Sequence, residues 1–96
     1  MMHIELHGLV GDFAENKDVA RDLRLQRIIP AFERGETVVI DFAHVTGATQ
    51  SFVHALISDL FRKYGEETLD RLEFKNCNEV IQKVITIVTE YMQEST

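Results

Sequence analysis

The segment that most constrains the fold is residues 37–64, TVVIDFAHVTGATQSFVHALISDLFRKY. Its first six residues are apolar except for Thr37 and Asp41, which predicts a buried central strand with cover on both faces. The next eight are rich in Thr and polar residues and predict a loop. Apolar side chains then recur at three- and four-residue spacing up to Tyr64, which predicts an amphipathic helix closed by Gly65.

The residues before this segment predict a strand and a kinked helix. Residues 2–6 alternate apolar and polar side chains, as a strand with one wetter face does. Residues 8–11 fit either a turn or a second short strand. Asn16 is suited to cap the helix that follows it. Pro30 removes a backbone donor from that helix, so we expect a kink or break near Arg27.

The residues after it predict one more strand and a last helix. Residues 71–75 alternate apolar and charged side chains and are expected to form the strand. Asn78 can cap the helix, although the β-branched run ITIV leaves a strand as the alternative. We expect residues 92–96 to fray. The apolar residues of this helix are expected on one side: Val80, Ile81, Val84, Ile85, Val88 and Tyr91.

The predicted order of elements is β-α-β-α-β-α. Short connections and right-handed crossovers favour an α/β fold, with a small, mainly parallel or mixed sheet of three or four strands and about three helices packed on it. A chain of 96 residues is long enough for one core but not for two, so residues 1–96 are expected to form a single domain. The order of the strands in the sheet stays open.

Composition narrows the function classes. A net charge of −6 argues against nucleic-acid binding, which depends on Lys and Arg to neutralise phosphates. No apolar run approaches the roughly 20 residues of a membrane span, and no signal peptide is visible, so we expect no membrane association. The single cysteine, Cys77, suits a reducing compartment and is expected to be a packing residue. Together these features predict a cytoplasmic protein.

Histidines invite a metal interpretation, which their spacing does not support. They lie on a predicted strand, in a loop and in a helix, without the ligand spacing of a metal site: His3, His7, His44 and His54. We therefore expect no metal and no cofactor.

Asp41 stands near the carboxyl end of the central strand, where active-site carboxylates are common. Paired with His44 it could act as an acid–base couple, but no nucleophile or cofactor motif accompanies the pair. We expect no enzyme and no catalytic residue. The favoured role of Asp41 is loop support, in which its carboxylate accepts backbone N–H groups of the following loop.

Hydroxyl side chains surround the predicted start of the second helix, at Thr46, Thr49 and Ser51. One of them is needed to cap the helix, and Thr49 is best placed, with Phe52 three residues on. The same helix end tolerates a phosphate because its N–H groups and dipole favour negative charge. A hydroxyl here could therefore be a phosphorylation switch.

The run GETVVIDFAHVTGATQSFVHALISDLFRKYG, followed by LEFKNCNEVIQKVI, resembles the bacterial STAS-like domains, a group of small proteins without assigned function. The resemblance covers residues 23–87. More distantly, the chain resembles the STAS domain of anti-anti-sigma factors. In those proteins a serine at the start of the helix after the central strand is phosphorylated by a histidine-kinase-like ATPase, and the dephosphorylated domain binds that ATPase and frees a sigma factor.

This resemblance places Ser51 at the phosphorylated serine and Thr49 at the acid of the family motif. The usual Asp-Ser-(Ser/Thr)-Gly is replaced by Thr-Gln-Ser-Phe at residues 49–52, which favours a protein-binding face over a phosphoswitch. The function implied is a regulatory interaction module that docks a histidine-kinase-like ATPase. The docking residues expected from the loop and the exposed side of the helix are Thr46, Thr49, Gln50, Ser51, His54, Ser58 and Arg62.

Two alternatives remain open. The same helix end could serve a small-ligand or nucleotide sensor as an anion site. Leu9, Val10 and Phe13 lie outside the periodic segments, so they are expected to cover the sheet or to contact a second copy in a homodimer. An uncovered edge strand is a second route to self-association.

Overall fold

The computed structural model describes residues 1–94, and three parallel strands form its main sheet. These are β1 (Met2–Glu5), β3 (Val38–Asp41) and β5 (Leu72–Lys75), in the order β1-β3-β5. The strand order, left open by the sequence, thus has the predicted central strand in the middle. The predicted α/β class with a mainly parallel sheet is confirmed.

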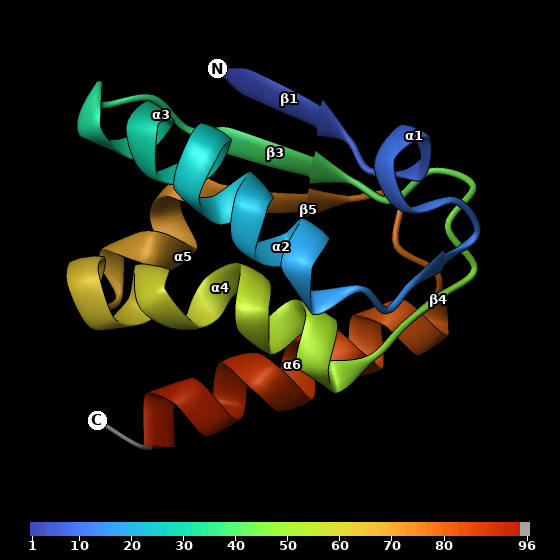
Figure 1. The fold of residues 1–96 in the computed structure, drawn as a ribbon. Helices are drawn as coiled ribbons and strands as arrows, with labels where there is room; N and C mark the ends of the chain where they lie inside the picture. Colours follow the sequence, from blue (N-terminus) through green and yellow to red (C-terminus); the bar gives the residue numbers. More distant parts are fainter. Residues whose placement is uncertain (95–96) are drawn as a thin grey trace.

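The larger helices lie in front of and below the strands in Figure 1. They are α2 (Lys17–Leu23), α3 (Ile29–Glu33), α4 (Gln50–Tyr64) and α6 (Glu79–Glu94). α4 packs against α2 and against α6, so it is the middle helix of the layer. The core lies between this layer and the sheet, where Phe42, Phe52 and Leu56 are fully buried. Within residues 1–94 no helix has the length and apolar character needed to cross a membrane.

The sheet has one apolar and one polar face because side chains alternate along each strand. The strand register aligns Ile4, Ile40 and Phe74 on one face, where Ile4 and Ile40 are fully buried. One residue earlier, it aligns His3 and Glu73 with the central strand on the opposite face, and both of these side chains are exposed.

All four residues of β3 are buried, as predicted, although the opposite face of the sheet carries the exposed side chains of His3 and Glu73. Val39 and Asp41 alternate with the core residues of β3, so they point to the polar face, yet both are buried. The His3 imidazole of β1 contacts the Asp41 carboxylate on this face. The apolar run therefore reflects the central position of β3 between two strands and not a second layer of helices.

Residues 17–33 form a helical rod with an irregular middle. Asn16 caps α2 as predicted, because its Oδ1 accepts the N–H groups of Asp18 and Val19. A π-helical turn, η1 (Arg24–Ile28), joins α2 to α3, and Pro30 lies in the first turn of α3. The irregularity predicted near Arg27 is confirmed. It is a π-helical turn, which is wider than an α-helical turn, and the helix is not broken there.

Arg24 ties this rod to α4. Its guanidinium is buried, donates to the Ala55 carbonyl and pairs with the Asp59 carboxylate at 3.2 Å. The contact holds η1 against the middle of α4, which limits how far α2 can move from the start of that helix.

Residues 8–11 belong mainly to a one-turn helix, α1 (His7–Val10), and the short strand β2 (Phe13–Ala14) follows it. β2 pairs in parallel with β4 (Gly47–Ala48), which lies inside the segment predicted to be a loop. A Cβ atom on Gly47 would lie 2.7 Å from Cε1 of Phe13, so a larger residue there would force this ring to move.

Leu9, Val10 and Phe13 were expected to cover the sheet or to contact a second copy, and of these three only Val10 packs against the core. Leu9 and Phe13 are exposed, and Val10 is only partly buried. The Phe13 ring lies over the β4 backbone instead, which places it at the end of the molecule where the loop after β3 lies.

The last third of the chain adds a short helix that the sequence did not reveal, α5 (Glu67–Arg71). Residues 79–94 form the helix α6 and not the strand that was the alternative. Asn78 caps this helix, because its side chain accepts the Ile81 N–H. Val80 and Tyr91 are exposed, against the prediction that they share the buried side. The fraying predicted from residue 92 is wrong up to Glu94, because α6 is helical there; residues 95 and 96 lie outside the described residues.

We predict that truncation of the two sheet faces has unequal effects on stability. Ile40→Ala should lower the free energy of unfolding by about 2–5 kcal/mol, because it leaves a cavity under the helices. Glu73→Ala, on the neighbouring strand but on the polar face, should change it by less than about 0.5 kcal/mol. Urea unfolding measures both, and equal losses would contradict the two-faced sheet.

Candidate functional site

The loop that joins β3 to α4 is anchored at its start by Asp41. One carboxylate oxygen, Oδ1, accepts hydrogen bonds of 2.9 Å from the Ala43 N–H and from the Asn76 side-chain amide. The other, Oδ2, lies 2.9 Å from Nε2 of His3. The expected loop support by Asp41 is confirmed, and the same carboxylate also joins the carboxyl end of β3 to both neighbouring strands.

These contacts keep Asp41 ionised. The Asn76 amide, then the Ala43 N–H and then the His3 ring lower the pKa of the Asp41 carboxyl from 3.8 to about 2. His44, the partner considered for acid–base chemistry, instead stands edge-on to His7, with ring centroids 5.8 Å apart. Burial, followed by the charge of Asp41, raises the pKa of the Cys77 thiol to about 11. No three metal-ligating side chains cluster within the described part of the chain.

Further hydrogen bonds hold the far half of the loop. The Thr46 N–H and hydroxyl both donate to the Asp12 carbonyl, at 2.7 and 3.0 Å. The Asn78 amide donates to the Thr46 carbonyl, and the Thr49 N–H donates to the Ala14 carbonyl. Thr46, expected at a docking surface, is exposed but has its hydroxyl engaged in this structural contact.

Thr49 caps α4, as predicted. Its backbone is extended and its Oγ1 accepts the Phe52 N–H at 3.0 Å. Ser51 is therefore the second residue of the helix. Its side chain is exposed, and its hydroxyl has no hydrogen-bond partner among the described residues. The first turn of this 15-residue helix thus carries a free hydroxyl. The Thr49 cap and the hydrogen bonds of the preceding loop fix the position of the helix start.

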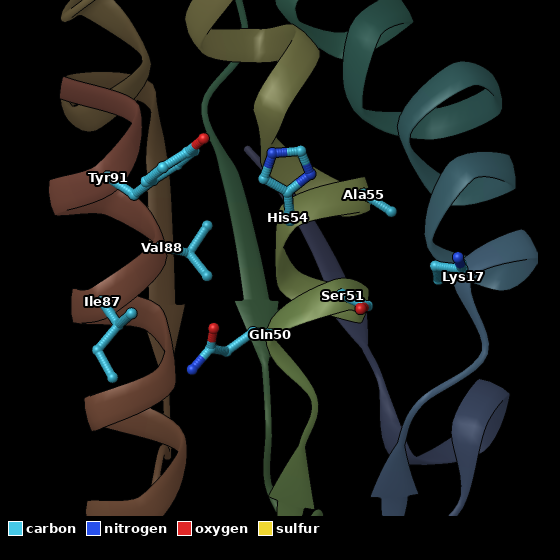
Figure 2. Close-up of a pocket in the computed structure, with 8 residues that line it drawn as sticks. All are labelled: Lys17, Gln50, Ser51, His54, Ala55, Ile87, Val88 and Tyr91. Atoms are coloured by element: carbon cyan, nitrogen blue, oxygen red, sulfur yellow. The ribbon is translucent and has the colours of Figure 1, made fainter. Parts of the chain in front are cut away.

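A groove of about 480 Å³ opens beside Ser51, between α4 and its neighbours. α4 contributes Gln50, Ser51, His54 and Ala55, α6 contributes Ile87, Val88 and Tyr91, and α2 contributes Lys17. Figure 2 shows the α6 side chains on one flank of α4 and Lys17 on the other, on the side to which Ser51 points. The rings of His54 and Tyr91 lie 6.4 Å apart across the groove. The groove therefore combines an apolar wall, two aromatic rings, one ammonium group and a free hydroxyl.

The structure brings together only part of the predicted docking set. Gln50, Ser51 and His54 line the groove, and Thr49 lies directly before it. Arg62 is exposed but lies outside the groove. Its guanidinium pairs with Asp59 at 2.6 Å.

Ser58 was expected on the exposed side of α4. This expectation is wrong, because Ser58 is buried. α4 is packed between α2 and α6, so the small side chain of Ser58 in its middle is enclosed.

We did not predict from the sequence the groove residues outside α4, namely Lys17, Ile87, Val88 and Tyr91. They come from helices that begin far away in the chain, and their approach to Ser51 depends on how these helices pack. A weak signal was available for α6, whose apolar residues cover more of the helix surface than one buried face requires.

We predict that acid weakens the Asp41 anchor. Because its pKa is lower in the folded than in the unfolded protein, its contribution to stability is complete above about pH 5 and is lost as the pH falls from 3.8 through about 2. Asp41→Asn should reduce stability at pH 7 and flatten the loss over this window. Asp70→Asn, at an exposed position, should leave the wild-type pH profile unchanged. Thermal unfolding between pH 2 and 7 measures both, and a wild-type profile for Asp41→Asn would contradict the assignment.

The capping role of Thr49 is also testable. Thr49→Ala should lower the free energy of unfolding by about 1 kcal/mol, whereas Thr49→Asn, which can still accept the Phe52 N–H, should lose much less. Ser51→Ala is the matched control and should change stability by less than about 0.5 kcal/mol, because the Ser51 hydroxyl has no partner. Urea titrations of the three variants separate these effects, and an equal loss for Ala and Asn would argue against the cap.

Comparison with known proteins gives one match. The family model described as a STAS-like domain of unknown function (DUF4325) matches residues 19–82, two thirds of the chain. This span includes β3, the loop after it, α4 and β5. No significant match exists among the curated proteins or among the solved structures.

Proposed function

Because the chain belongs to the family of STAS-like domains of unknown function, we propose that it is a regulatory interaction module that docks a histidine-kinase-like ATPase. The observation that carries the proposal is the free, exposed Ser51 hydroxyl at the rigid start of α4, directly beside the groove. The partner is suggested by the distant resemblance to anti-anti-sigma factors. The groove supplies the apolar and aromatic surface that binding of a protein partner needs.

The contacts of the site support docking more than chemistry. The loop from Asp41 to Thr49 is held by hydrogen bonds to both neighbouring strands and to β2, so its shape is formed before a partner arrives. The aromatic and aliphatic side chains of His54, Tyr91 and Ile87 offer apolar contact. Aromatic side chains in such a setting are common energetic centres of interfaces.

Ser51 gives this surface a means of regulation. A phosphate there would lie at the second position of α4, where the helix dipole and free N–H groups favour negative charge. Lys17 lines the same groove and could pair with it. Phosphorylation would therefore leave the fold intact while it places about two negative charges in the docking surface.

The proposed switch predicts that a charge at Ser51 weakens partner binding. The tagged protein, purified from its own host, should carry a histidine-kinase-like ATPase, identified by mass spectrometry together with any phosphate at residues 46–51. With that ATPase purified, Ser51→Asp should bind at least about tenfold more weakly than Ser51→Ala, because the carboxylate must be desolvated on docking.

Gln26→Glu is the matched control, since it adds the same charge at an exposed position outside the groove, and it should bind like the wild type. Equal binding by Ser51→Asp and Ser51→Ala would remove the switch. An ATPase that never co-purifies would remove the partner.

A small-ligand sensor is the second candidate. The volume of the groove falls within the range of small-ligand sites, and Lys17 provides one positive charge for an anionic group near the α4 start. Thermal-shift measurements with nucleotides and phosphorylated metabolites test it, because a ligand at 100 times its Kd stabilises the fold by about 2.7 kcal/mol. The absence of any shift would exclude this function for the compounds screened.

A further inference from the structure

α6 carries two parallel rows of apolar side chains, and only one of them is fully buried in the fold, although Val84 of the other also packs against the core. Ile81, Ile85, Val88 and Met92 form the inner row and are buried. The outer row has the same spacing of four, three and four residues: Val80, Val84, Ile87 and Tyr91. The described residues thus leave a second apolar face on this helix.

The outer row is open to solvent. Val80, Ile87 and Tyr91 are 57%, 49% and 60% exposed, and Val84 is partly buried. Three large apolar side chains exposed in one row along a single helix differ from scattered surface residues, which need no explanation. Alternating spacings of three and four are those of the contact row between two packed helices.

Charged residues, among them Glu79, Lys83 and Glu90, lie along one side of this row. Lys83 and Glu90 stand seven residues apart, so they lie on the same side of the outer row, about 10 Å apart along the helix. Both are exposed, and neither forms an ion pair with another described residue. Reversal of the helix exchanges their positions, so the charge pattern is complementary to itself in an antiparallel pair.

We propose that α6 pairs antiparallel with α6 of a second copy of this chain through the outer row. Val84 of each copy would face Ile87 of the other, and Val80 would face Tyr91, since both pairs are symmetric about the same point of the helix. Lys83 would then lie near Glu90 of the second copy at both ends of the contact. Such an arrangement has the twofold symmetry expected of a homodimer.

The charges favour this orientation. In a parallel, in-register pair the twofold axis would run along the helices and would place the Lys83–Glu90 side of the two copies on opposite sides of the contact, so no Lys83–Glu90 pair would form across it. The contact is small for a stable interface, because only four apolar residues per copy contribute, so we expect a dissociation constant on the order of tens of micromolar.

The proposed pairing also involves residues of the groove beside Ser51. Ile87 and Tyr91 belong to the outer row and line the groove beside Ser51. Self-association and occupation of the groove would therefore exclude one another. This consequence rests on the proposed function, whereas the pairing itself does not.

Sedimentation equilibrium of the purified chain, from about 1 to 500 µM, tests the pairing without any partner protein. The wild type should shift from monomer to dimer over this range, and Ile87→Glu should weaken association at least about tenfold. Leu69→Glu is the matched control, because Leu69 is 46% exposed on α5 and outside the row; it should behave like the wild type. Circular dichroism checks that each variant is folded.

A charge exchange tests the orientation. Lys83→Glu or Glu90→Lys alone should weaken the dimer about three- to tenfold, and the double variant should restore it. A wild type that stays monomeric, a dimer unaffected by Ile87→Glu, or a double variant no stronger than either single one would overturn the proposal. The assay contains no ATPase, so its failure is distinct from failure of the proposed function.

Discussion

The ionised carboxylate of Asp41 is the interaction on which the arrangement of the site depends. Through His3 and Asn76 it joins the ends of the three strands, and through the Ala43 N–H it sets the first turn of the loop to α4. This charge at the carboxyl end of the central strand is stabilised because each hydrogen-bond donor favours its ionised form. Ser51 owes its fixed position to this anchor and to the Thr49 cap.

The packing of α4 decides which of its residues can meet a partner. With α2 on one flank and α6 on the other, its middle is enclosed and its first turns open into a groove. The wall of that groove comes from the same helix, α6, that presents a second apolar row. The proposed binding at Ser51 and the proposed self-association would therefore exclude one another, because Ile87 and Tyr91 would take part in both.

Much of the fold could be predicted because its signals are local. The caps at Asn16, Thr49 and Asn78, the glycine after α4 and the apolar run of β3 each act within a few residues. Burial could not be predicted in the same way. Ser58 is enclosed and Tyr91 is exposed because of how separate helices pack. The spacing of apolar residues within one helix carries no information on that packing. The strands β2 and β4 have two residues each, too few to leave a pattern.

We propose that the groove beside Ser51 is the docking surface. An NMR titration of the isotopically labelled chain with the purified ATPase tests this proposal. We expect the amide signals of residues 50–55 and 87–91 to shift, while those of the polar sheet face around His3 and Glu73 stay unchanged. Shifts confined to the sheet face, with Ser51 unaffected, would contradict it.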